Sequence, residues 1–276
     1  MQSSQRKRAE RSQRGEESQS QRGEGSQSQR TRSDNFSEEQ LEAAVLNVTA
    51  FLLSDLRNKR RLKKDEVVTN ALNKSARQYG AIMKRVKSNL SDVFGLQITK
   101  IPDCNDDAFI IINKHREEFS KLTKMLTSES ELQDRLVLTV SLASIFMNRG
   151  EMFESHLMTI LETIGFFSDK FYGSSCERKM KDYVTKLVNK QFVKQMYLDA
   201  KVVARPNQEM NPPLPVNESK VTVLRWGYRA YLEVDADKIV QYLEKIHDNK
   251  RPPAFPASYY KELKIQQATM RAQAQG

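Results

Sequence analysis

The chain has 276 residues, with 45 Lys plus Arg against 35 Asp plus Glu and a formal net charge of +10. This length favours two small domains over one, and the positive balance favours acidic partners such as nucleic acid without indicating a fold. No apolar run approaches the ~18 residues of a membrane span, and the charged N-terminus contains no secretion signal. Cys104 and Cys176 have no ligand spacing around them and are expected to be reduced thiols. We expect a soluble intracellular protein that does not bind membranes.

Residues 1–35 are predicted to be a disordered tail. The segment "QRGEESQS" at 13–20 recurs as "QRGEGSQS" at 21–28, and Ser, Gln, Gly and Arg cannot bury enough apolar surface to offset the entropy of ordering. Ser-Gln pairs, which DNA-damage checkpoint kinases prefer, make six serines candidate phosphorylation sites: Ser4, Ser12, Ser18, Ser20, Ser26 and Ser28. The duplication by itself also accounts for most of these pairs, so a solubilising arm without regulation is the alternative.

Residues 36–125 are predicted to form a first winged-helix unit. Ser37 begins a helix as its N-cap, and apolar residues at helical spacing follow it: Leu41, Val45, Val48, Leu52 and Leu56. Two further helices are expected at 64–74 and 79–95, the second ending at Gly95. The segments "LQITKI" and "AFIII" then predict two strands around a turn-rich connector. Helices followed by a β-hairpin are the order of a winged helix.

Residues 126–265 repeat this order and predict a second winged-helix unit. Helices are expected at 128–150, 150–167 and 174–192, and strands at 193–205 and 220–234. A last helix is expected at 235–249, with Asp235 or Asp237 as its N-cap. Residues 266–276 are expected to be a flexible C-terminus. The predicted fold class is mainly α with small β-hairpins, arranged as tandem winged helices after a disordered tail.

Several motifs, taken in order along the chain, resemble those of the MAGE homology domain. They are "FLLSDL", "VFGLQITKI", "SLASIFMNRG", "LETIGFF", "RWGYRAYLE" and "AFPASYYKEL", and together they cover roughly residues 40–265. Tyr228 departs from the family, in which many members have proline after Trp-Gly.

The resemblance implies a tandem winged-helix protein that binds RING-type ubiquitin ligases. The most widely distributed type in the family is the third non-SMC element of the SMC five-six complex, and the single domain and tail of this chain resemble it. That membership implies a RING ligase subunit, a kleisin subunit and double-stranded DNA as partners, and a nuclear, chromatin-associated role in DNA repair. An adaptor that regulates a RING ligase outside any SMC complex is the alternative. A sequence-specific winged-helix transcription factor ranks last, because the basic helix offers few residues suited to base contacts.

The dileucine Leu52–Leu53 is the candidate RING-binding site. Adjacent helical residues lie about 100° apart, so if Leu52 belongs to the buried stripe, Leu53 lies off it and forms a second apolar ridge with Leu46. The alternative is that Leu53 is simply an exposed apolar residue, which is common on protein surfaces. Its binding role is implied by the resemblance, because members of the family contact the RING ligase at this dileucine position.

Basic residues form three groups: 57–64; Lys84, Arg85 and Lys87; and a set in the second unit. The last group contains the candidate DNA-binding residues, on the helix that a winged helix would present to a groove: Arg178, Lys179, Lys181, Lys186, Lys190 and Lys194. A solvated lysine face is the alternative. Lysines bind phosphate as point charges, so the expected mode is backbone contact with little sequence readout.

The single tryptophan is interpreted as part of a structural anchor. Trp226, Gly227 and Arg229 resemble the family's Trp-Gly-x-Arg-Ala junction, whereas a nucleotide-stacking role for Trp226 is the alternative. The three histidines, His115, His156 and His247, have no partners at metal-ligand spacing. Phosphate-binding loops, nucleophile elbows and HExxH motifs are also missing from the sequence. We expect neither an enzyme nor a cofactor or metal site.

Overall fold

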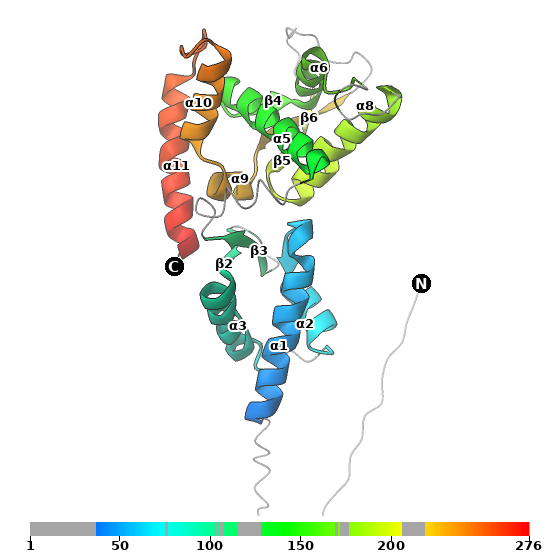
Figure 1. Ribbon diagram of the computed structural model, residues 1–276, viewed down its shortest axis with the longest axis vertical. Helices are drawn as coiled ribbons and strands as arrows, with labels where there is room; N and C mark the ends of the chain where they lie inside the picture. The colour runs from blue at the N-terminus through cyan, green and yellow to red at the C-terminus, as the bar shows by residue number, and fades with distance from the viewer. Residues whose placement is uncertain are drawn as a thin grey trace, which may run out of the picture. The chain divides into compact units, whose positions relative to one another are not determined.

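Two winged-helix units follow each other along the chain (Figure 1). The computed structural model describes residues 37–74, 77–102, 104, 107–114, 128–168, 171, 177–205 and 219–275. Residues 36–276 form one compact unit, so both winged-helix units belong to it. This arrangement confirms the predicted tandem winged-helix class. The six candidate phosphorylation serines, His115 and Cys176 lie outside the described residues.

The first unit combines helices with a three-stranded antiparallel sheet in the order β1-β3-β2. Its helices and strands are α1 (Glu38–Asp55), β1 (Leu62–Lys63), α2 (Lys64–Ala71), α3 (Tyr79–Phe94), β2 (Leu96–Lys100) and β3 (Ala108–Asn113). In Figure 1, α1 and α3 lie beside each other, and α3 continues through a tight turn into β2.

Local signals fix the ends of the first-unit helices. Ser37 caps α1 through a capping box: its hydroxyl accepts from the Gln40 amide at 3.2 Å, and the Gln40 side chain accepts from the Ser37 amide at 3.0 Å. Gly95 ends α3 in the left-handed region at φ 63°, as the sequence predicts. The apolar stripe of α1 is buried from Leu41 to Leu52. Local capping and periodicity therefore place α1 and α3.

The second unit repeats the order with a sheet β4-β6-β5. Its elements are α5 (Glu129–Met147), β4 (Glu151–Phe153), α6 (Glu154–Ile164), α8 (Glu177–Lys186), the π-helix η2 (Leu187–Phe192), β5 (Leu198–Ala204) and β6 (Lys220–Trp226). β5 and β6 pair over their whole lengths, from Leu198 opposite Trp226 to Ala204 opposite Lys220. A separate apolar core fills this unit and includes Phe146, Leu157 and Trp226.

Two features differ from the predictions, whereas the start of α10 agrees with them. The short strands β1 and β4 were not expected, because two or three residues give no alternation to detect. The predicted strand at 220–234 ends at Trp226, and α9 (Tyr228–Glu233) follows it. α10 (Ala236–Ile246) begins after the expected cap Asp235, whose side chain accepts from the Asp237 amide at 3.0 Å.

The C-terminal helix α11 (Ala257–Gln275) corrects the expectation of a flexible C-terminus from residue 266. Tertiary contacts explain its length. Leu263 is fully buried, and the buried Gln267 side chain accepts from the Ala236 amide at 3.3 Å and donates to the Val234 carbonyl at 2.6 Å. Burial and hydrogen bonding to α9 and α10 stabilise this segment as a helix, and its Ala, Gln, Lys, Glu and Leu residues are themselves good helix formers.

Asp237 joins α10 to α11. The Tyr260 hydroxyl donates to one of its carboxylate oxygens, and Lys264 Nζ lies 3.0 Å from the other. These hydrogen bonds hold the pKa of Asp237 below its ordinary value. We call this group the α10–α11 clasp.

The sheet of the first unit is buried on both faces. Phe109 and Ile111 belong to the apolar core of the first unit, which we call the first core. Strand alternation therefore directs Ala108 and Ile110 to the opposite face of the sheet. Both are nevertheless 1% exposed or less. On that face the Gln97 side chain donates to the Ala274 carbonyl of α11 at 2.6 Å, so the second unit covers it. No helix in the described ranges is long and apolar enough to cross a membrane.

Candidate functional site

The dileucine lies near the end of α1 with its two side chains in different surroundings. Leu52 is fully buried in the first core. Leu53 is partly buried and packs against the edge of that core, whereas Leu46, seven residues earlier, is 66% exposed. The predicted separation of Leu52 from Leu53 is therefore present, and the outer ridge is most exposed at Leu46.

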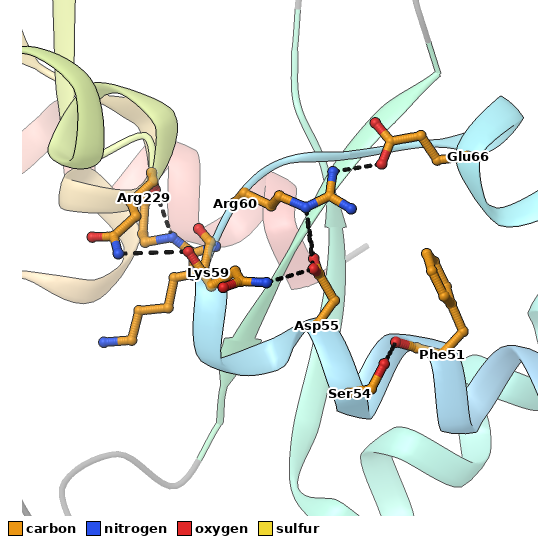
Figure 2. A network of polar contacts seen from close by, with 9 residues as sticks. Phe51, Ser54, Asp55, Lys59, Arg60, Glu66 and Arg229 are labelled. Carbon is orange, nitrogen blue, oxygen red and sulfur yellow. Dashed lines mark hydrogen bonds and ion pairs between the residues drawn. The ribbon is translucent and has the colours of Figure 1, made fainter. Parts of the chain in front are cut away.

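The basic connector after α1 is held by carboxylates. Arg60 Nε lies 3.0 Å from one oxygen of Asp55 and donates to the other at 3.1 Å, and its Nη1 contacts Glu66 at 2.5 Å. Figure 2 shows Arg60 directed toward both acids, with Asp55 at the end of α1. Asp55 also accepts from Asn58 at 2.8 Å. The charge of Arg60 thus serves the local fold, so the connector offers less free positive charge than its sequence suggests.

Arg229 connects the two winged-helix units from a buried position. Its side chain is 2% exposed and donates to two carbonyls of the first unit, Lys59 at 2.9 Å and Ile111 at 2.8 Å. Within its own unit it donates to the Gln195 carbonyl and to the Glu233 carboxylate, both at 2.8 Å. Figure 2 shows the guanidinium next to the Lys59 backbone. A planar guanidinium with five donors suits such a convergence of acceptors.

Tyr197 and Glu233 complete this junction. The Tyr197 hydroxyl donates to the second Glu233 oxygen at 2.6 Å, and both Arg229 and the Lys59 ammonium lie 5.8 Å from the centre of its ring. Arg229 was predicted from the sequence as part of the structural anchor, whereas Tyr197 and Glu233 were not. The i,i+4 spacing of Arg229 and Glu233 on a helix was the available signal for the ion pair.

Trp226 and Gly227 precede Arg229 and are both constrained. Trp226 is 3% exposed, and its indole donates to the Leu142 carbonyl of α5 at 3.0 Å. A Cβ on Gly227 would overlap the Met196 carbonyl. The Trp-Gly-x-Arg segment thus packs against α5 and against the turn at Met196 that follows η2.

A cleft of about 740 Å³ separates parts of the two units. Arg61 and Pro102 line it from the first unit, and Lys194 and Tyr228 line it from the second. Burial raises the pKa of Tyr228. Lys194, predicted as part of a DNA-binding face, therefore lies on this inter-unit cleft.

The basic helix of the second unit does not present one uniform face. Lys179, Lys181, Lys186 and Lys190 are all exposed, and Lys181 also lies 3.8 Å from Glu162 and 5.7 Å from the centre of the Phe167 ring. The α-helix ends at Lys186 and continues as the π-helix η2, whose wider turn interrupts the regular spacing assumed in the sequence analysis. Arg178 lies on α8, but its side chain is outside the described part of the structure.

Outside the junction and the basic helix, other titratable residues include Arg85 of α3, His156 and His247. On α3, Arg85 pairs with Glu38 of α1 at 2.5 Å. His247 is exposed, and the Nε2 atom of the half-buried His156 has no hydrogen-bond partner among the described residues. No group of three His, Cys, Asp or Glu side chains suited to a metal occurs in the described ranges.

Comparison with known proteins identifies similar chains. A model of the MAGE homology domain matches residues 48–237. The human melanoma-associated antigen B2 is 26% identical over 85% of this chain, which spans 66% of that relative, just under two thirds. The mouse non-structural maintenance of chromosomes element 3 homolog is 24% identical over 85% of this chain and 77% of its own length. A solved chain of an Nse1-Nse3-Nse4 complex superposes with a TM-score of 0.60 at 25% identity, over 87% of this chain and 100% of the solved one.

Proposed function

The chain belongs to the MAGE homology domain family, and from this we propose that it is a non-catalytic subunit of the SMC five-six complex. In this role it binds a RING-type ubiquitin ligase subunit, a kleisin subunit and double-stranded DNA, and it acts on chromatin in the nucleus during DNA repair and chromosome maintenance. One observation carries the proposal: this chain matches a chain of an Nse1-Nse3-Nse4 complex over that chain's full length. The likeness to the mouse element 3 homolog supports the same role.

The proposed RING-binding surface is the outer ridge of α1. Leu52 is fully buried, so its contribution to binding is indirect, through the position of the helix. Leu53 and the 66% exposed Leu46 supply the apolar side chains that a partner can cover. Any ligase chemistry belongs to the RING partner, which this chain positions and can stimulate.

The proposed DNA-binding surface consists of the exposed lysines Lys179, Lys181, Lys186, Lys190 and Lys194, together with Arg178 of the predicted set. These lysines provide point charges without the bidentate geometry that reads base edges, so we expect phosphate contacts and binding independent of sequence. Phosphorylation of the six Ser-Gln serines would add roughly −1.5 to −2 charge each to the tail and would oppose DNA binding. The lysine surface and the phosphorylation of the tail are both proposed for the full chain.

A MAGE-type adaptor that regulates a RING ligase outside any SMC complex is the second candidate. The likeness to the human melanoma-associated antigen B2 favours it. Both candidates use the same α1 ridge for the ligase and differ in whether a kleisin and SMC subunits are also bound.

Affinity purification from native cells with mass spectrometry distinguishes the two candidates. The tagged wild-type chain is compared with Leu53→Ala, and Val93→Ala, an exposed apolar residue of α3, is the matched control. SMC, kleisin and RING subunits recovered with wild type and with the control support the proposal. A RING ligase recovered alone supports the adaptor, and the absence of any RING ligase contradicts both.

A further inference from the structure

The interface between the two winged-helix units has a buried part and an exposed rim. Arg229 forms the buried part through its bonds to the Lys59 and Ile111 carbonyls. The preceding residue, Tyr228, forms the rim: its hydroxyl donates to the Lys100 carbonyl at the end of β2, at 3.1 Å. Neighbouring residues at the start of α9 therefore bind the first unit in two different environments.

The backbone at residue 228 does not require tyrosine. Tyr228 is the first residue of α9, and its N-cap Gly227 is extended, with φ −87° and ψ 168°. Amides in the first turn of a helix have no acceptor within the helix, and proline is favoured at the first position. Extended geometry at the preceding residue is also what proline demands. The tyrosine side chain must therefore be explained by its own contacts.

Those contacts close the interface beside the cleft. Lys100 ends β2, and the next two residues, Ile101 and Pro102, line the cleft together with Tyr228. Thr99, directly before Lys100, is 3% exposed, and strand alternation places it on the sheet face that the second unit covers. Separation at the rim would expose this face first.

We propose that the Tyr228 hydroxyl is a latch that closes the rim of the interface between the two winged-helix units. Breaking its bond to the Lys100 carbonyl allows the rim to open while the Arg229 junction remains intact. A net intramolecular hydrogen bond of this kind changes an opening equilibrium by roughly two- to tenfold. Tyr228 thereby sets how often the cleft and the covered sheet face become accessible.

A buried thiol at the interface measures this opening. Thr99→Cys, in a Cys104→Ser, Cys176→Ser chain, places a sulfhydryl of similar size on the covered face, and the Thr99 hydroxyl it replaces has no hydrogen-bond partner among the described residues. Ala108→Cys, 1% exposed on the same face, is a second reporter in case the first perturbs the strand. The labelling rate with a small thiol reagent under native conditions is proportional to the opening equilibrium constant when closing is fast.

Two variants of the latch are then compared in this background. Tyr228→Phe removes only the hydroxyl, and Tyr228→Pro removes the side chain at a position where proline fits the helix. Tyr242→Phe, a half-buried tyrosine of α10, is the matched control. Both latch variants are expected to label about two to ten times faster than wild type, and the control is expected to label at the wild-type rate.

Three results would overturn the latch. An unchanged labelling rate in Tyr228→Phe would show that the hydroxyl does not keep the rim of the interface closed. Faster labelling in Tyr228→Pro alone would assign the effect to packing of the ring. A cysteine in the second core, Ala143→Cys, reports global unfolding, and a parallel rise there would show that the variants destabilise the whole fold.

Discussion

Replacing Arg229 with methionine is expected to lower the free energy of unfolding by about 3–5 kcal/mol. Methionine fills much of the space of the arginine stem but donates no hydrogen bonds. It leaves the Glu233 carboxylate, 13% exposed, with its charge uncompensated, and it leaves the Lys59 and Ile111 carbonyls without the guanidinium that bridges the two units. The cost is dominated by the buried, unpaired charge, because a buried ion that loses its partner keeps its desolvation penalty.

A double-variant cycle separates the charge from the carbonyl contacts. Glu233→Gln removes the charge and keeps an acceptor for the Tyr197 hydroxyl, which donates to Glu233 at 2.6 Å. The variant Arg229→Met, Glu233→Gln is therefore expected to be more stable than Arg229→Met alone, by about 0.5–3 kcal/mol. Any loss that remains relative to wild type reports the three carbonyls that accept from Arg229.

Urea unfolding at neutral pH, followed by the fluorescence of Trp226, measures these differences. The chain has one tryptophan, it is 3% exposed, and it lies three residues before Arg229. Equal slopes of free energy against urea are needed for the comparison. A loss below about 1 kcal/mol in Arg229→Met, the cost of an ordinary hydrogen bond, would refute the buried-charge reasoning. A double variant no more stable than Arg229→Met would refute it as well.

Further predictions concern the two proposed surfaces and the α10–α11 clasp. Leu53→Ala is expected to weaken RING-partner binding in calorimetry while the chain keeps its circular dichroism spectrum; unchanged affinity would remove the ridge from the interface. Lys186→Glu with Lys190→Glu is expected to weaken binding equally for duplexes of unrelated sequence and to lower the salt slope by about two, whereas Lys245→Glu on α10 should have little effect. The pKa of Asp237 is lowered in the folded chain, so the clasp stabilises above the ordinary carboxyl pKa and this contribution is lost as pH falls through the folded pKa. Asp237→Asn should remove that part of the acid sensitivity measured by thermal unfolding; identical acid profiles would show that the clasp contributes nothing.

Local chemistry was sufficient to predict most helices from the sequence. The Ser37 cap, the α1 stripe and the Gly95 end are encoded by residues within one or two turns of each other, and the structure has all three. The order of helices followed by a hairpin is also encoded by local patterns, and because this order occurs twice, the sequence predicted two winged-helix units. Strands of two or three residues and the short helix α9 lack a period and were missed.

Contacts between distant residues determined what the sequence left open. α11 packs through the buried Leu263 and Gln267, and its last turns are held by the bond from Arg271 to the Val234 carbonyl and the bond from Gln97 to the Ala274 carbonyl. Lys181 and Lys194 were grouped with the other lysines because they lie on or next to the helix that a winged helix would present to a groove. Tertiary structure gave Lys181 the partner Glu162 and placed Lys194 on the cleft.

The sequence by itself determined the tandem winged-helix class and marked Trp226, Gly227 and Arg229 as a structural segment. Only the tertiary structure decided what Arg229 binds, because three of its acceptors are main-chain carbonyls of Lys59, Ile111 and Gln195. Every residue carries a carbonyl, so no side-chain pattern identifies which ones a distant guanidinium reaches. That choice follows from how the two units pack, which depends on the whole folded chain.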